Sequence, residues 1–316
     1  MQNHYIFAEM KKNILFIILV FLISTISFAQ EVANDSTGVK EKDKPVRSPF
    51  ESSYLIDAQT TVVPAVKTLE AIIQHKFGTI ENGSSDLWGI YGAGTNIRFG
   101  LNYVIVKNFQ IGAGITKTKM ATDLNAKWVI LKQTRKNTIP VAVALFGNVA
   151  IDGRNVSAFE SGKVRVAYSG PTVSFKFPDR LSYFSQLIVG RKFTDWLSVQ
   201  AGASFTHYNS VGVLYDHDKI GAHFNGRIKV SPQGSIIFNY DAPLKIKGIS
   251  EQREWTNPPK PNIAFGYEVS TGSHVFQIFM GSSSSLLPQE NIMWNQNDFN
   301  SSQLSIGFNI TRLWGF

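Results

Sequence analysis

Residues 303–316 read QLSIGFNITRLWGF, and apolar and polar side chains alternate strictly through most of this stretch. Leu304, Ile306, Phe308 and Ile310 share one face of an extended chain, and the residues between them share the other face. An apolar face opposed to a polar face over about ten residues is the unit of a transmembrane β-barrel strand. The stretch therefore predicts a membrane-spanning strand.

The same stretch closes on an aromatic residue, Phe316. A final barrel strand with an aromatic end resembles the signal that the bacterial barrel-assembly machinery reads on outer-membrane proteins. We therefore expect Phe316 to act as an assembly signal, and we expect the assembly machinery and outer-membrane lipid to be partners of this chain.

Period-two alternation recurs along the chain, without a helical period of comparable length. It predicts twelve strands, at residues 66–77, 96–105, 109–116, 124–133, 139–150, 181–192, 197–208, 219–230, 235–240, 262–270, 274–281 and 303–314. Residues 163–168 and 172–177 either add a hairpin, which would make fourteen strands, or form a ribbon in an outer loop. Aromatic side chains near strand ends favour the two girdles of a membrane barrel; they are Phe77, Tyr103, Phe109, Tyr183, Trp196, Tyr208, Tyr240 and Trp314.

The connections between these strands alternate in length. Short ones are expected near residues 106–108, 134–138, 193–196, 231–234 and 271–273, and long ones at 78–95, 151–180, 209–218, 241–261 and 282–302. Outer-membrane barrels have short periplasmic turns and longer outside loops, and an even strand number returns the chain to the periplasm. The predicted fold class is an all-β, antiparallel up-and-down transmembrane β-barrel of about twelve strands.

The N-terminal region has the features of a secretory signal peptide. Lys11 and Lys12 precede an apolar run, and Ser27-Phe28-Ala29 is a small-residue cleavage site. We expect residues 1–29 to be a signal peptide cleaved after Ala29, with Met10 as the natural start. Residues 30–64 then form a polar, disordered periplasmic lead, and residues 65–316 form the barrel. The end of the lead, residues 48–64, either enters the lumen as a plug or approaches the first strand outside it.

Composition narrows the classes of function. The chain has no cysteine, which excludes disulfides, thiolate catalysis and cysteine-based zinc sites. Residues 1–29 contribute +1 and residues 30–64 contribute −2 to the net charge of +8, so residues 65–316 carry +9. A basic exported domain without a run of Lys and Arg favours an anionic membrane surface or an anion-attracting cavity over nucleic acid.

The face of each strand opposite to the lipid is predicted to line a lumen. Its charged members are Lys76, Arg98, Arg227, Lys229, Glu70 and Glu268, together with Lys219 and, less clearly, Lys127. The basic excess would favour small anionic solutes, whereas mutual pairing of these groups would brace a closed barrel. Several glycines share this face, where they leave space for a passage or an inserted segment, or allow strand coiling.

Other candidate sites are weak. Asp216, His217 and Asp218 could hold a divalent ion, but a charged turn is the better explanation, because adjacent residues rarely converge on one ion without distant partners. His207 and Ser210 are the only nearby pair for a lipid hydrolase, and short spacing does not establish that geometry. No motif predicts a cofactor.

Several blocks of the sequence resemble an uncharacterised outer-membrane β-barrel family of Bacteroidota. They include RSPFESSYLIDAQTTVVPAVKTLEAIIQHKFGTIENGSSDLWGIY, IPVAVALFGNVAIDGR, RLSYFSQLIVGRKF and the closing IGFNITRLW. The resemblance covers residues 47–316 and implies a barrel in the outer membrane of a Gram-negative bacterium. It carries no catalytic or ligand motif.

Function is therefore predicted from the lumen and the loops. The favoured hypothesis is a pore or transporter for small solutes, with anionic solutes as one option and Arg98, Arg227 and Lys229 as the residues that would carry the function. The alternative is a closed structural or interaction barrel that presents residues 78–95, 151–180 and 282–302 outside, or that docks a periplasmic partner. A lipid hydrolase is the third hypothesis.

Overall fold

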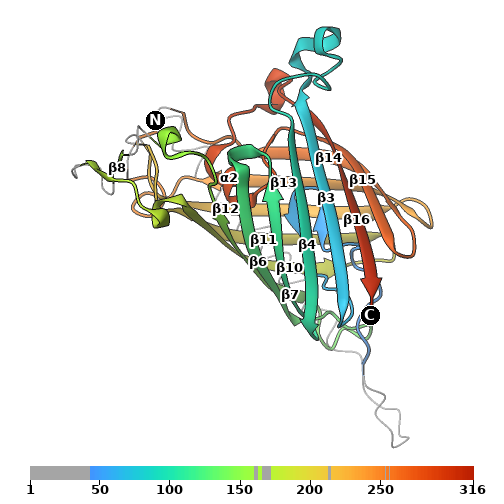
Figure 1. Cartoon of the computed structure of the whole chain (residues 1–316). Coiled ribbons are helices and arrows are strands. Elements are labelled where there is room, and N and C mark those ends of the chain that lie inside the picture. The colour runs from blue at the N-terminus through green and yellow to red at the C-terminus, as the bar shows by residue number, and fades with distance from the viewer. Residues whose placement is uncertain (1–42, 160–162, 166–171, 213–214, 253, 256) are drawn as a thin grey trace, which may run out of the picture.

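The computed structural model describes residues 43–159, 163–165, 172–212, 215–252, 254–255 and 257–316, and its main feature is a closed barrel (Figure 1). Neighbouring strands pair antiparallel in chain order, and the last strand pairs with the first to close the wall. The wall contains β3 (Thr68–Thr79), β4 (Asn96–Val106), β5 (Phe109–Thr116), β6 (Ala121–Leu131), β7 (Ala142–Ile151), β10 (Leu181–Lys192), β11 (Leu197–Tyr208), β12 (Asp218–Lys229), β13 (Gly234–Leu244), β14 (Asn262–Ser270), β15 (His274–Gly281) and β16 (Ser305–Gly315). The predicted twelve-stranded barrel is confirmed.

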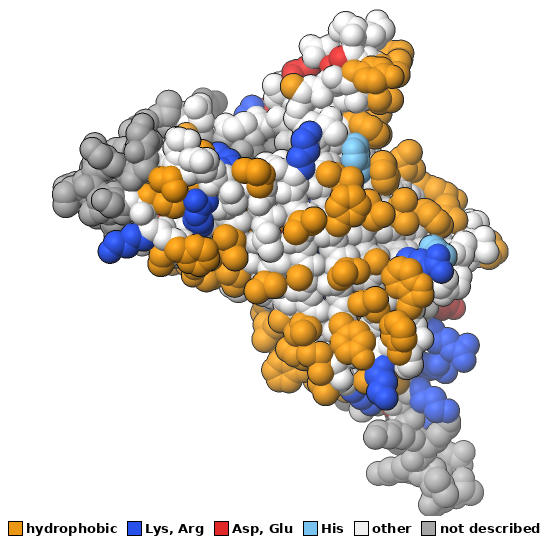
Figure 2. All heavy atoms as spheres, in the orientation of Figure 1, with side chains coloured by type: hydrophobic (Ala, Val, Ile, Leu, Met, Phe, Trp, Pro, Cys, Tyr) orange, Lys and Arg blue, Asp and Glu red, His pale blue; other side chains and the backbone are white. Residues whose placement is uncertain are grey.

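The two faces of the wall follow the alternation in the sequence. In β16, Ser305, Asn309 and Thr311 are buried inside, whereas Ile306 and Phe308 between them face outward and stay partly exposed. Figure 2 shows hydrophobic side chains spread over the outer surface of the barrel. The most exposed of them on the strands include Leu101, Ile115, Leu124, Phe265 and Ile278, each at least 55% exposed. A continuous apolar exterior around a polar interior is the arrangement that lipid requires.

Several predicted boundaries differ from the structure. The connection expected at 134–138 extends over 132–141, because Pro140 lacks a ladder donor and Thr134 pairs with Pro45 instead of a wall strand. The connection after β5, which the sequence predicts as intermediate in length at residues 117–123, spans only residues 117–120. The strands β8 (Lys163–Arg165) and β9 (Thr172–Ser174) pair only with each other, so they form a loop ribbon and add nothing to the wall.

The barrel has two distinct ends. At the turn end lie the short connections 107–108, 193–196, 230–233 and 271–273 and the C-terminus; at the loop end lie 80–95, 152–180, 209–217, 245–261 and 282–304. The loop after β3 projects beyond the wall at the loop end (Figure 1). The helical turns are η1 (Ile80–Asp86), η2 (Thr118–Met120), η3 (Val156–Ala158), η5 (Phe177–Arg180), α2 (Pro288–Trp294) and η6 (Phe299–Ser301). Within the described residues, no helix is long and apolar enough to cross a membrane.

Residues 43–67, which we call the inner segment, fill much of the lumen. The segment enters at the turn end, runs inward to the short hairpin β1 (Tyr54–Leu55) and β2 (Ala58–Gln59), and returns to β3. The hairpin lies inside the wall in Figure 1. Its residues are at most 7% exposed, apart from Asp57 at the turn between β1 and β2.

A second insert enters from the loop end. The connection between β15 and β16 folds inward and places α2 in the lumen, where it contacts β10, β11, β12 and β13. Gln289, Ile292 and Met293 are at most 1% exposed. The sequence predicted this connection only as an outer loop. The lumen is thus occupied from both ends.

Apolar contacts anchor both inserts to the wall. Leu55 and Ile56 of the inner segment pack with Ile237 and Phe279, and Val63 packs in a second cluster that also contains Ile292 of α2. Full burial of one such side chain contributes roughly 1.5–3 kcal/mol. The inserts are therefore integral parts of this conformation.

Candidate functional site

The charged residues predicted to line the lumen do face inward, because they occupy the alternate positions of β3, β4, β12 and β14. Glu70, Lys76, Arg98, Arg227 and Glu268 are at most 5% exposed. Lys229 lies on the same face of β12 but is only half-buried, because it is the last residue of the strand at the turn end. Charges buried this deeply require hydrogen-bonded partners.

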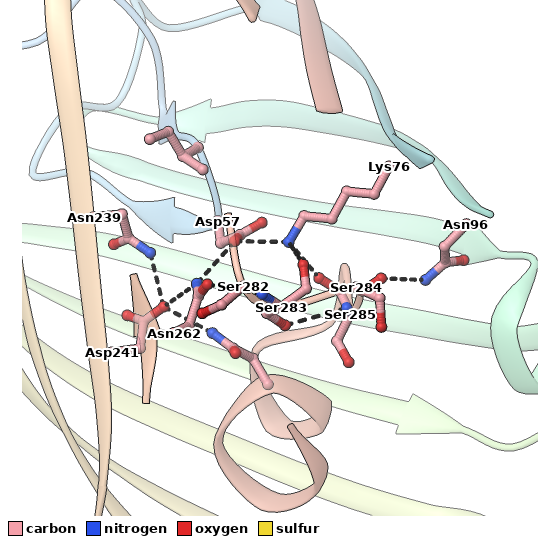
Figure 3. Close-up of polar contacts among 12 residues, drawn as sticks. Asp57, Lys76, Asn96, Asn239, Asp241, Asn262, Ser282, Ser283, Ser284 and Ser285 are labelled. Carbon is pink, nitrogen blue, oxygen red and sulfur yellow. Dashed lines mark hydrogen bonds and ion pairs between the residues drawn. The ribbon is translucent and has the colours of Figure 1, made fainter. Parts of the chain in front are cut away.

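Lys76 joins the wall to both inserts (Figure 3). Its Nζ lies 2.7 Å from Asp57 Oδ2 of the inner segment and donates to the carbonyl oxygens of Ser283 and Ser285, at 2.7 and 2.9 Å. Asp57 Oδ2 also accepts from Asn262 Nδ2 at 3.0 Å. Because residues 283–285 lead into α2, one fully buried ammonium binds the inner segment and the α2 connection simultaneously.

Arg227 makes a second contact between the wall and the inner segment. Its Nη2 lies 2.7 Å from Glu51 Oε1, and its Nε lies 3.1 Å from Glu268 Oε1 on the neighbouring wall. The Nε also donates to Ser235 Oγ at 2.9 Å. The guanidinium therefore divides its contacts between a wall carboxylate and a carboxylate of the inner segment.

Lys127, whose place on the lumen face the sequence left open, is the third such cation. It is 2% exposed, and its Nζ donates to the Ser53 carbonyl and to Gln59 Oε1, both at 3.0 Å. Lys76, Lys127 and Arg227 thus share one property. Each depends on acceptors that the inner segment supplies.

Arg98 behaves differently, because its counter-ion belongs to the wall. Its Nε and Nη2 donate to the two carboxylate oxygens of Asp123, at 2.8 and 2.7 Å, and its Nη1 donates to Gln74. A Cβ at Gly114 would lie 2.6 Å from Asp123 Oδ1 and closer still to Arg98 Nη2. At least this inward glycine therefore makes room for a large lumenal side chain.

Asp241 on β13 connects the wall to α2. Its Oδ2 accepts from Asn239, Asn262 and Asn291, at 2.7, 3.1 and 2.7 Å, and Asn291 belongs to α2. Its Oδ1 lies 2.7 Å from His223 Nδ1. Since Asn262 also binds Asp57, this network reaches the inner segment, as Figure 3 shows.

His223 extends the network into a Ser–His–Asp chain. Its Nε2 lies 2.7 Å from Ser204 Oγ, opposite to the contact with Asp241, so the order matches that of hydrolytic triads. All three residues are at most 7% exposed. A Cβ at Gly221 would lie 2.6 Å from Ser204 Oγ and 2.8 Å from Ile292 Cδ1, so α2 occupies the space beside the hydroxyl. In this conformation the Ser204–His223–Asp241 series is therefore a buried structural network.

The space that remains between the inserts is small. A cavity of about 20 Å³ lies there, with a lining that includes Asp57, Gln59, Arg98, His223 and Asn291. This volume holds about one water molecule. At this point of the lumen the two inserts therefore leave no room for a solute larger than water.

The structure separates the members of the weaker candidate sites. Asp216 Oδ2 accepts from the Trp255 indole, His217 Nδ1 lies 2.6 Å from the Tyr208 carbonyl, and Asp218 Oδ1 lies 2.6 Å from His207 Nδ1. The three residues thus make contacts in different directions. Within the described residues, no group of three His, Asp or Glu side chains could hold a metal ion.

Two further outcomes concern the neighbouring loop. His207 is held by Asp218 and, through Nε2, by Asn209 Oδ1 at 3.1 Å, and neither of its hydrogen bonds involves Ser210. Tyr208 was wrongly assigned to the outer girdle. It is 8% exposed and donates to Glu290 Oε1 of α2 at 2.7 Å. The alternation of β11 carried the signal, because position 208 shares a face with lumenal Ser204.

Three comparisons place the chain among known proteins. A family model described as "Membrane bound beta barrel domain (DUF5777)" matches residues 50–314. Among solved structures, the KdgM porin is similar at 8% identity and a TM-score of 0.42, over 79% of this chain and 99% of that one. An outer membrane channel from Pseudomonas putida F1 is similar at 10% identity and a TM-score of 0.48, over 80% and 97% of the two chains. The NanC porin is similar at 7% identity and a TM-score of 0.43, over 78% and 99%. No curated protein matches the sequence.

Proposed function

Because the chain belongs to the membrane bound beta barrel domain family (DUF5777), we propose that it is a gated passage for small anionic solutes in the outer membrane of a Gram-negative bacterium. The passage is closed at rest by the inner segment and α2. Export would use the signal peptide at residues 1–29, which lies outside the described residues.

One observation carries this proposal. Three buried wall cations, Lys76, Lys127 and Arg227, have partners on the inner segment. If the segment withdraws, these cations face a water-filled lumen without those acceptors, and their positive potential attracts anions. An entering anion would replace the lost partners. The wall thus becomes anion-selective in the open state.

The predicted solute-binding residues receive different roles in this proposal. Arg227 and Lys76 bind the solute's anionic group after the segment has left. Arg98 keeps its pairing with Asp123 and shapes the wall, and Lys229 attracts anions at the turn end.

Glu70 accepts from Asn102 and Gln110, at 3.0 and 2.7 Å, and Glu268 accepts from Gln277 at 2.8 Å. Both carboxylates limit the positive potential.

The test is single-channel conductance of the refolded protein, residues 30–316, in a planar bilayer. We expect the parent to be almost silent, and we expect Glu51→Gln/Asp57→Asn to open more often because it weakens both ion pairs of the inner segment. Deletion of residues 43–64 should give steady, anion-preferring conductance. Adding Lys76→Met/Lys127→Met/Arg227→Met to the deletion should remove the anion preference, and the exposed Lys136→Met is the matched control.

A closed interaction barrel is the second candidate, and the cavity of about 20 Å³ favours it. Silence of every variant above, with a folded barrel verified by its heat-modifiable migration in gels, would support this candidate and contradict the passage. Its binding surfaces would be the outer loops at residues 78–95, 151–180 and 282–302, or the turn end that faces the periplasm. We infer no hydrolase function from His207, because Asp218 and Asn209 occupy both of its ring nitrogens.

A further inference from the structure

A pocket of about 200 Å³ opens at the loop end, above α2. Its lining comes from the β5–β6 connection, the loop after β7, the beginning of β10, the end of β11 and α2. The side chains that decide its chemistry are Lys119, Phe159, Arg180, Tyr208, Glu290 and Trp294. No predicted lumen residue belongs to it, so it is distinct from the closed centre of the barrel.

Two of the three basic residues around the pocket are already neutralised. Lys119 Nζ lies 2.8 Å from Glu290 Oε1, and Arg154 Nη2 lies 2.6 Å from Asp152 Oδ2. The ammonium of Lys119 also lies 5.6 Å from the centre of the Tyr208 ring. These pairs leave little positive charge for a ligand.

Arg180 is the exception. Its Nη1 donates to the carbonyl oxygens of Asp152 and Arg154, at 2.7 and 2.6 Å, and its guanidinium lies 5.4 Å from the centre of the Phe159 ring. Phe175 lies at a similar distance, 5.1 Å. Within the described residues, no carboxylate forms an ion pair with it. Among the described residues, backbone carbonyls and aromatic rings hold the guanidinium in place.

The remaining lining suits a ring that carries hydroxyl groups. Tyr208, Trp294 and Phe159 contribute aromatic rings, which in this conformation contact the side chains of Lys119 and Arg180. The lining also contains Ser182, Ser210 and Asp179, which offer hydroxyl and carboxylate partners. The volume is smaller than the roughly 300–1,000 Å³ of pockets for drug-sized ligands. Such a pocket accepts one small ring, not an oligomer.

We propose that this pocket binds a monosaccharide-sized solute with one carboxylate, and that Arg180 binds the carboxylate. The proposal rests on the proposed function, because it names the class of solute and its first binding site. The hydroxyl groups would pair with the serines and Asp179, and the ring would lie against the aromatic side chains. A guanidinium presents parallel donors that match the two oxygens of a carboxylate.

The pocket is also connected to the outer insert. Glu290 and Trp294 are residues of α2, and Lys119 and Tyr208 both contact Glu290. A ligand among these side chains therefore changes the contacts that hold α2 in the lumen. Solute binding at the loop end would in this way precede opening.

Glucuronate binding to the refolded full-length mature protein in detergent tests the proposal, with calorimetry and the intrinsic tryptophan fluorescence of the protein as readouts. We expect saturable binding of glucuronate and much weaker binding of glucose and of acetate. Arg180→Gln should weaken glucuronate binding about tenfold to a hundredfold, because a charge-assisted contact is lost. The outward-facing Arg312→Gln is the matched control and should bind like the parent.

A second variant distinguishes loss of the binding site from loss of the fold. Ala158 is exposed and lines the pocket, so Ala158→Trp should block binding without removing a charge. The proposal fails if the parent shows no saturable binding, if glucose binds as well as glucuronate, or if folded Arg180→Gln binds like the parent. Because the assay needs no conductance, the pocket can fail while the passage stands, and the reverse also holds.

Discussion

At the scale of single residues, the sequence predicts which face of the wall a side chain occupies, but not which residue it pairs with. Strict alternation places Lys76 and Arg227 on the lumen face, and the structure has both there. Their partners Asp57 and Glu51 come from a stretch without any period, so no pattern could assign them. The pairs depend on a chain reversal inside the barrel, which is a tertiary event.

The Lys76–Asp57 pair gives the first prediction. Asp57→Asn leaves the ammonium buried without its counter-ion, which costs about 3–5 kcal/mol when a buried pair is broken. Lys76→Met/Asp57→Asn should recover part of this loss. Urea unfolding in lipid vesicles measures both, and the exposed Glu81→Gln should change stability by less than about 0.5 kcal/mol. An unchanged Asp57→Asn would show that the carbonyls of Ser283 and Ser285 suffice for Lys76.

The glycines of the lumen face give the second prediction. Gly114→Ala places a methyl group against the Arg98–Asp123 pair, and overpacking of this kind costs about 1–3 kcal/mol. Gly272→Ala in a turn meets no atom within 4 Å and serves as the control. If the two variants unfold at the same urea concentration, Arg98 moves freely and the glycine has another role.

At the scale of elements, the strands were predictable, the entry of residues 48–64 into the lumen was one of two alternatives, and α2 was not predicted. Strands such as β10 and β15 have the predicted bounds because lipid outside and polar groups inside impose a period of two. α2 was missed because its seven residues are too few for a helical period to stand out. The signal lay in the apolar residues of this stretch, since an outer loop would leave them in water; they include Leu287, directly before the helix, and Ile292 and Met293 within it.

The loop that contains η1 gives a prediction about pH. The Asn82 side chain, together with the Gly89 amide, lowers the pKa of Asp86 below its usual value of 3.8. A depressed folded pKa stabilises the loop above pH 3.8, and this contribution is lost as the pH falls below that value. The protection factor of the Gly89 amide, which is the intrinsic exchange rate divided by the observed rate at the same pH, should therefore fall in that acid range. Asp86→Asn should remove the pH dependence, and persistence of the dependence in this variant would assign it to another group.

At the scale of the whole molecule, the central question is whether the inner segment moves. The wall is a closed ladder of hydrogen bonds, so a passage can open only by displacement of what lies within it. Polar contacts such as Lys127 with Gln59 favour that movement, whereas burial of Leu55 and Ile56 opposes it. The balance between these two contributions cannot be read from composition, because it depends on which contacts of the inner segment water would replace.

A reversible crosslink would decide this point. Ser52 Oγ lies 3.2 Å from Thr311 Oγ1 on β16, which suits the short Cβ separation of a disulfide. The chain has no cysteine, so Ser52→Cys/Thr311→Cys would introduce the only thiols. Built into the Glu51→Gln/Asp57→Asn background, the oxidised protein should stay silent in the bilayer, and reduction should restore the openings. Each single cysteine variant should open regardless of redox state. Equal conductance before and after reduction would mean that the inner segment does not move at Ser52 when solutes pass. The gate would then have to be α2.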